Sequence, residues 1–156
     1  MISCTFENGT QASPPLRHVI IDAVIVDGEK ILLVKRAPQL TGGNKWAFVG
    51  GFVQHNEFIK ETLAREVTEE TGHEVIDMTL FMINDNPSRN EDRQNIAMIF
   101  ICKVGNKIGE PDWENTEIKW FDFDNLPKKE EFAFDHYKML QVFLQYRKEK
   151  VSLPIF

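Results

Sequence analysis

The stretch from Gly51 to Gly72, GFVQHNEFIKETLAREVTEETG, constrains this chain more than any other part of it. Good helix formers dominate from Glu57 to Thr71 and no proline interrupts them, so we expect a helix there. Apolar residues recur in it at every fourth position: Ile59, Leu63 and Val67. Gly72 is a natural stop, because glycine readily adopts the left-handed conformation that ends helices. The sequence therefore predicts a helix with one buried stripe.

Three glutamates crowd onto one face of this predicted helix. Glu66, Glu69 and Glu70 are spaced i, i+3 and i+4, along one border of the apolar stripe, which places them in a partly covered cleft. In the last turn the helix dipole disfavours each anion by about 0.3–1 kcal/mol. Like charges at i and i+4 repel by a further ~0.2–0.5 kcal/mol. A bound cation would reverse the sign of these effects, whereas the alternative for the glutamates alone is a solvated acidic helix end.

Gly51, Glu57 and Arg65 complete a longer pattern, Gly-x5-Glu-x7-Arg-Glu-U-x-Glu-Glu-x-Gly-U, with U a bulky apolar residue. This pattern resembles that of the Nudix hydrolases, and every fixed position of it is met. The resemblance extends from about residue 17 to 146, through LLVKR at 32–36, KWAFVGG at 45–51, and WF at 120–121 followed by LP at 126–127. It implies an α/β protein of the Nudix fold, with a mixed β-sheet sandwiched between α-helices.

The rest of the chain agrees with this fold class. At 156 residues the chain suits one domain that buries roughly two-thirds of its unfolded surface. We expect residues 1–16 to be an extended arm and 17–156 to be the Nudix domain. A last helix is expected from Asp135 to Glu149. The expected strands are 18–26, 31–35, 45–49, 75–83, 95–104 and 117–123.

Composition excludes several classes of function. A net charge of −6 argues against general nucleic-acid binding. No apolar run approaches the ~20 residues of a membrane helix, and the N-terminus lacks a signal-peptide pattern, so we expect a cytoplasmic protein with no membrane partner. Cys4 and Cys102 lie too far apart in sequence to indicate a zinc site or a disulfide framework. Members of the resembled family commonly form dimers, which implies a homodimer.

The resemblance also implies a catalytic chemistry. Water would attack a pyrophosphate phosphorus with the help of Mg²⁺, or of Mn²⁺ in its place. The implied metal ligands are the carbonyl of Gly51 and the carboxylates of Glu66, Glu69 and Glu70, with Glu69 as ligand or water-orienting base. Glu57 and Arg65 would form an ion pair that fixes the glutamates. A further carboxylate outside the pattern is left open among four candidates: Glu114, Glu117, Glu91 and Asp92.

Three positions depart from the family pattern. Val49 replaces the usual proline before the glycine pair, and Gln54 stands where many members have glutamate. His73 takes the final bulky apolar position, where we expect a helix-end residue. None of these changes removes a predicted metal ligand.

Features beyond the pattern point to the substrate. Pro87 stands fifteen residues after Gly72, and residues 86–93 and 133–136 are similar to segments of ADP-ribose pyrophosphatase-like members. The implied reaction cleaves ADP-ribose, or a related nucleotide sugar, to AMP and a sugar phosphate. Cationic candidates for substrate contact are Arg89, Arg93, Arg36 and Lys45. Aromatic candidates for stacking on a base are Phe48, Phe52 and Trp46, for which the alternative is core packing, the more frequent role of aromatic residues beside a glycine turn.

Two other functions remain open from sequence. One is hydrolysis of (deoxy)nucleoside triphosphates to release pyrophosphate. The other is a sensor that binds ADP-ribose without cleaving it, since fold does not dictate function.

Overall fold

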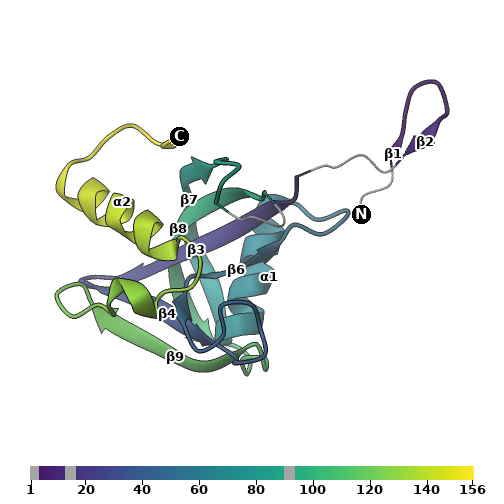
Figure 1. The fold of residues 1–156 in the computed structure, drawn as a ribbon. Helices are drawn as coiled ribbons and strands as arrows, with labels where there is room; N and C mark the ends of the chain where they lie inside the picture. Colours follow the sequence, from purple (N-terminus) through teal and green to yellow (C-terminus); the bar gives the residue numbers. More distant parts are fainter. Residues whose placement is uncertain (1–3, 13–16, 90–93) are drawn as a thin grey trace.

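The computed structural model describes residues 4–12, 17–89 and 94–156 (Figure 1). Two short strands come first, followed by the strands and helices of the main body. The elements are β1 (Cys4–Thr5), β2 (Gln11–Ala12), β3 (Val19–Asp27), β4 (Lys30–Arg36), β5 (Trp46–Ala47), β6 (Val49–Phe52), α1 (Ile59–Thr71), β7 (His73–Asn84), β8 (Ile96–Lys107), β9 (Asn115–Asp122), a 3₁₀ turn η1 (Lys129–Glu131) and α2 (His136–Lys148).

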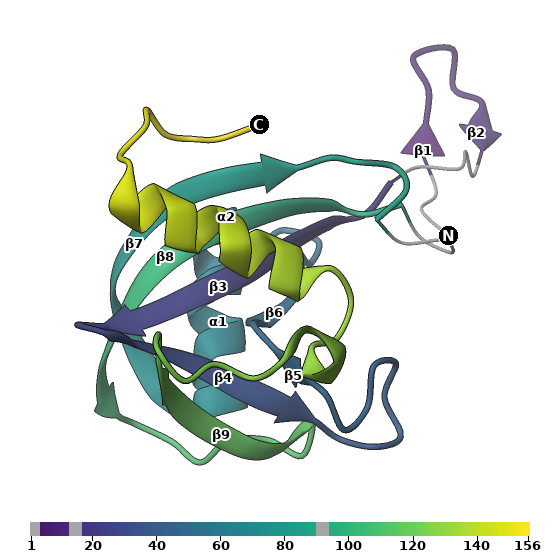
Figure 2. The same ribbon diagram turned by 60° about the vertical axis from the view of Figure 1, so that its left-hand side comes forward.

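Strand β3 is the centre of the main sheet. It pairs parallel with β8 and antiparallel with β4 and β6, so the sheet is mixed. The strand order is β5-β4-β3-β8-β7, with β6 also paired to β3 and β9 to β4 (Figure 2). The β3–β6 register sets Asp22 opposite Gly50 and Ile21 opposite Gly51. This pairing fixes the backbone that carries the predicted metal ligand Gly51.

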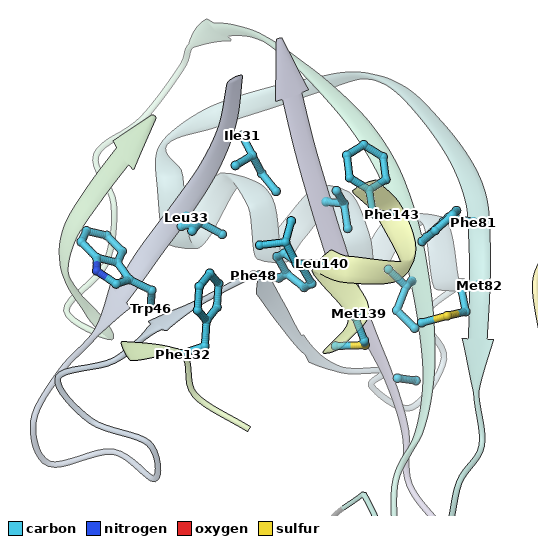
Figure 3. Packing of buried hydrophobic residues seen from close by; sticks show 13 residues of the cluster. Ile31, Leu33, Trp46, Phe48, Phe81, Met82, Phe132, Met139, Leu140 and Phe143 are labelled. Carbon is cyan, nitrogen blue, oxygen red and sulfur yellow. The ribbon is translucent and has the colours of Figure 1, made fainter. Parts of the chain in front are cut away.

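The two helices cover opposite faces of this sheet, and a hydrophobic core lies under each (Figures 1 and 2). Under α2, Met139, Leu140 and Phe143 pack on residues of β4, β7 and β8 (Figure 3). Under α1, Leu63 and Val67 are fully buried against the other face. Side chains alternate between the two faces along β3, because successive residues of a strand point in opposite directions. The predicted sandwich of a mixed sheet between helices is confirmed.

Helix α1 begins at Ile59, two residues later than the sequence predicts. The backbone at Phe58 is extended, and its N–H donates to the carboxylate of Glu61 at 2.9 Å, which satisfies one of the free donors of the helix start. The predicted end is confirmed. Gly72 has φ of 76° and its N–H donates to the carbonyl of Thr68 at 2.8 Å. A Cβ at Gly72 would lie 2.3 Å from the carbonyl oxygen of Gly109, so glycine is required there.

The strand predicted over residues 45–49 is instead two short strands, β5 and β6, that meet at Phe48. The N–H of Phe48 donates to Nδ1 of His136 at 2.9 Å, in place of a partner in a neighbouring strand. The break therefore has a tertiary cause, which no local pattern encodes.

The predicted N-terminal arm contains a small hairpin formed by β1 and β2. In both ribbon views this hairpin lies apart from the main sheet (Figures 1 and 2). Entry into β3 is fixed by Arg17, whose side chain donates to the carbonyl oxygens of Asp85, Gln94 and Asn95. Across the described ranges, no helix is long and apolar enough to cross a bilayer.

Candidate active site

Arg65 is the hub of an ion-pair network on α1. Its Nε and Nη2 donate to the two carboxylate oxygens of Glu57, at 2.7 and 3.1 Å. Its Nη1 donates to Glu66 Oε1 at 2.7 Å and to Glu69 Oε2 at 2.9 Å. Hydrogen bonding to Arg65 lowers the pKa of Glu57 to about 2. The predicted Glu57–Arg65 ion pair is confirmed, and the same guanidinium also holds two of the three glutamates.

The loop before α1 folds back to present Glu57 to Arg65. Glu57 Oε2 accepts from the hydroxyl of Thr62 at 2.7 Å and from the N–H of Gln54 at 3.3 Å. Arg65 Nη2 also lies 3.4 Å from the carbonyl oxygen of Phe52. These bonds tie the end of β6 to the first turns of α1. Arg65 can therefore orient the glutamates without itself reaching a substrate.

Glu70 lies on the sheet side of α1 and is only 4% exposed. Its Oε1 accepts from the N–H of Gly50 at 3.0 Å, and its Oε2 accepts from Nδ2 of Asn115 at 2.7 Å. Burial nevertheless raises the pKa of Glu70 to about 8, because desolvation outweighs these two hydrogen bonds. The two hydrogen bonds hold the carboxylate in one orientation. Its buried surroundings disfavour the negative charge unless a cation lies nearby.

Glu66 packs directly against the backbone of Gly51. A Cβ at Gly51 would lie 2.2 Å from Glu66 Oε1, so only glycine permits this approach. Burial raises the pKa of Glu66, and the charges of Glu69 and Glu114 add to that effect against the opposing pull of Arg65. The structure thus brings Gly51 and Glu66 together, as the sequence predicts for two ligands of one ion.

The donor set fits a hard divalent cation. Carboxylate and carbonyl oxygens are the ligands that Mg²⁺ and Mn²⁺ prefer. A cation between Glu66 and Glu70 would offset the burial that raises both pKa values. Among the described residues, no three acidic, histidine or cysteine side chains are close enough to share one ion. Glu66, at 14% side-chain exposure, belongs to the more buried part of this donor set, whereas Glu69 is bonded to Arg65 and its side chain is 49% exposed.

The four candidates for an outlying carboxylate fall in different places. Glu114 is half-buried in the loop between β8 and β9, and its charge contributes to the raised pKa of Glu66. Glu117 is exposed on β9. Glu91 and Asp92 lie outside the described residues. Proximity therefore favours Glu114.

A cavity of about 270 Å³ opens beside the glycine pair on the α2 face of the sheet. Its walls combine charged, apolar and aromatic side chains from β3, β4, β6 and the segments around 40, 89, 95 and 134. The lining residues are Ile20, Asp22, Arg36, Leu40, Thr41, Gly50, Gly51, Phe52, Arg89, Asn95, Phe134 and His136. Because Gly51, a predicted metal ligand, lines this cavity, a substrate bound in it would lie next to the predicted metal site.

Asp22, Arg89, Asp135 and His136 form a buried charge cluster in and behind the cavity wall. Arg89 is held by Asp135, to which its Nε and Nη2 donate at 3.2 and 2.9 Å. Asp135 is the residue before α2, but its carboxylate holds Arg89 and Asn84 and makes no side-chain cap. Burial raises the pKa of Asp22 and lowers the pKa of His136. Sequence reasoning missed Asp22 and His136 as site residues.

The four predicted cations lie in different environments. Arg36 and Arg89 line the cavity. Arg36 donates from Nε to the carbonyl of Thr41 at 2.9 Å and stacks 5.2 Å above the ring centre of Phe134. Lys45 is exposed and is not among the cavity residues. Arg93 lies outside the described residues, so its role stays a prediction.

Two of the predicted stacking residues are core residues. Phe48 and Trp46 are 2% and 7% exposed and belong to the cluster under α2, so for these two the core alternative is confirmed and stacking on a base is not (Figure 3). Phe52 lines the cavity, as does Phe134, an aromatic residue of the segment 133–136 that was not among the predicted stacking residues. His73 begins β7, where its Nδ1 lies 3.0 Å from the carbonyl of Gly105, so it is not a helix-end residue.

Comparison with known proteins shows the family of this chain. Residues 16–143 match the NUDIX domain. Over 130 residues the chain is 34% identical to an ADP-ribose pyrophosphatase of Methanocaldococcus jannaschii, covering 83% of this chain and 74% of that protein. The chain belongs to the Nudix family. It is accordingly a hydrolase that acts on phosphorus-containing anhydrides, and members of the family generally use divalent metals.

Solved structures share the fold. A NUDIX hydrolase from Nitrosomonas europaea superposes with a TM-score of 0.78 at 24% identity, covering 95% of this chain and 80% of that one. A bifunctional NMN adenylyltransferase/ADP ribose pyrophosphatase from Francisella tularensis, complexed with AMP and a Mn ion, gives a TM-score of 0.69 at 23% identity, covering 86% of this chain and 43% of that one.

Proposed function

We propose that this protein is a Mg²⁺-dependent pyrophosphohydrolase that cleaves ADP-ribose, or a related nucleotide sugar, to AMP and a sugar phosphate. The observation that carries the proposal is the position of the cavity. It shares Gly50 and Gly51 with the glutamate site, so a nucleotide in the cavity would place its diphosphate at the glutamates. The resemblance to an ADP-ribose pyrophosphatase supports this substrate class.

Each side chain has a distinct part in this proposal. Glu66, Glu70 and the carbonyl of Gly51 would hold the cation, with Glu69 as a further ligand or the group that orients the attacking water. When bound, divalent cations would neutralise the diphosphate oxygens and lower the pKa of a water. Glu57 and Arg65 would keep the glutamates in place. Arg36 and Arg89 line the substrate's path with positive charge.

A product assay tests the proposal. The purified protein with Mg²⁺ should release AMP faster from ADP-ribose than from other ADP-sugars or NADH, and should release little pyrophosphate from nucleoside triphosphates. Pyrophosphate released mainly from triphosphates would keep the metal site but assign the function to nucleotide hydrolysis. ADP-ribose that binds without any turnover would instead identify a sensor. Replacing Mg²⁺ with Mn²⁺ in the same assay tests the choice of metal.

Glu57→Gln should lower activity by about 10–100-fold and raise the Mg²⁺ concentration needed for half-maximal rate. The reason is that Arg65 loses the paired carboxylate that fixes its guanidinium, while its bonds to Glu66 and Glu69 remain. A titration of rate against Mg²⁺ checks this, and excess Mg²⁺ should restore part of the rate.

The matched control for Glu57→Gln is Glu110→Gln. Glu110 pairs with Lys107 at 2.8 Å through a side chain that is 86% exposed. Exposed pairs of this kind contribute little, so the control should behave as wild type. An unchanged metal requirement in Glu57→Gln would contradict the positioning role.

A further inference from the structure

The cavity beside Gly50 and Gly51 holds polar groups that the reaction at the glutamates does not use. Three buried atoms in its walls have no hydrogen-bond partner among the described residues: Asp22 Oδ2, Arg89 Nη1 and Asn95 Oδ1. Buried polar atoms are nearly always paired in native proteins, and leaving them unpaired is costly. Three such atoms around one cavity indicate that a ligand supplies the missing partners.

These groups are held so that they cannot satisfy each other. His136 Nε2 lies 3.7 Å from Asp22 Oδ1, and Arg89 Nη2 lies 3.8 Å from Asp22 Oδ2. Both distances exceed a hydrogen bond. His136 is fixed because its Nδ1 accepts the N–H of Phe48, and Arg89 is fixed by its two bonds to Asp135. The Asp22 carboxylate is therefore kept free to accept from a ligand.

The cavity offers a ligand two acceptors and one donor between apolar and aromatic walls. Ile20, Leu40, Phe52 and Phe134 supply the apolar surface. The guanidinium group of Arg36 lies over the ring of Phe134 and adds a planar cationic group to that surface. A planar heterocycle that carries an amino group next to a ring nitrogen complements this arrangement.

We propose that this cavity recognises the adenine of the substrate: Asp22 and Asn95 accept hydrogen bonds from the exocyclic amino group, and Arg89 Nη1 donates to a ring nitrogen. This proposal rests on the proposed function, and in it these three residues set the enzyme's preference for one base. The sheet register places the base next to the predicted metal site, because Asp22 pairs with Gly50, the neighbour of the predicted ligand Gly51.

Other ligands fit these walls less well. Hypoxanthine and uracil would turn a carbonyl oxygen toward the Asp22 carboxylate or the Asn95 carbonyl, which places acceptor against acceptor. A sugar would leave the aromatic walls without a flat partner. Guanine also carries N–H donors beside an acceptor, so it is the competing base to test.

The experiment compares kcat/KM for ADP-ribose with that for inosine diphosphate ribose. These substrates differ only on one edge of the base, where the amino group becomes a carbonyl and the adjacent ring nitrogen gains a hydrogen. Wild type should prefer ADP-ribose by about tenfold to a hundredfold, since a site built to accept a hydrogen bond rejects an analogue that lacks the donor. Asp22→Asn presents an N–H to the carbonyl and should lower this preference about tenfold.

Two further variants keep the test decisive. Asp122→Asn makes the same chemical change at an exposed site on β9 and should leave the preference unchanged. Asn95→Ala removes one acceptor while retaining the buried charges, and should also lower the preference if Asp22→Asn fails to fold. A purely structural defect would lower both rates alike and leave their ratio constant.

Three outcomes would overturn the proposal. These are a ratio that is the same in wild type and both cavity variants, equal use of guanosine diphosphate ribose and ADP-ribose by wild type, and variants that change the choice between ADP-ribose and ADP-glucose instead. Failure of the proposed function has a different signature, which is the absence of AMP release by wild type. In that case AMP and IMP binding by calorimetry still tests the cavity, and tighter binding of AMP supports it.

Discussion

Glu70→Gln is expected to lower turnover by at least about 100-fold while the protein stays folded, a loss on the scale that follows removal of one electrostatic stabiliser from an active site. The carboxylate is nearly buried and is fixed by Gly50 and Asn115, so its charge is directed at one place. Glutamine keeps the shape and one acceptor oxygen but cannot carry the negative charge that a divalent cation needs. The loss should therefore appear in kcat with little change in secondary structure.

Steady-state rates and circular dichroism on the same preparations check this expectation. Glu110→Gln is again the control. It removes the same charge at an exposed position away from the predicted ligands, so it should retain wild-type turnover. A loss of only a few-fold in Glu70→Gln, with the metal requirement unchanged, would remove Glu70 from the metal site and leave Glu66 as the remaining buried ligand.

Much of the glutamate site follows from local sequence because its parts are close along the chain. The four-residue spacing of Ile59, Leu63 and Val67 fixes which side of α1 is buried, and that side fixes where the glutamates lie. Glu57 and Arg65 are only eight residues apart in sequence, so the short loop before the helix is enough to bring their side chains together. A motif of this kind is a local structure, and local structure is what sequence patterns describe well.

The cavity could not be predicted in the same way. Asp22, Asn95 and His136 come from β3, the residue before β8 and the start of α2, and only the tertiary fold brings them together. One signal was present: Asp22 interrupts the apolar run VIIDAVIV, on the same face as buried Val24. A lone carboxylate at an inward position of a central strand is costly unless it is paired or functional. Asn115, which orients Glu70, gave no such signal.

The metal-free protein should lose stability as pH rises, and Glu70 should be a principal cause. Its pKa is about 8 in the folded protein and near the ordinary value of 4.5 when unfolded. Between these values the folded state binds more protons than the unfolded state, so the free energy of unfolding falls as pH increases. The stabilisation is complete below the unfolded pKa and is lost through the folded pKa. The expected loss is on the order of 5 kcal/mol. Glu66, whose pKa is also raised, acts in the same direction.

Urea denaturation at a series of pH values from about 5 to about 9, with a chelator present, measures this slope. Glu70→Gln should flatten it and should be more stable than wild type at the alkaline end. Glu57 does not obscure the result, because its low pKa changes stability only in acid. Adding Mg²⁺ or Mn²⁺ should restore wild type at high pH and affect Glu70→Gln much less, since the cation takes over the role of the proton. If the free energy of unfolding of wild type and of Glu70→Gln changed with pH in the same way, burial would not raise the pKa of Glu70. The large loss of activity and the gain of alkaline stability therefore test the same claim, that burial prepares Glu70 for a cation at a cost to the fold.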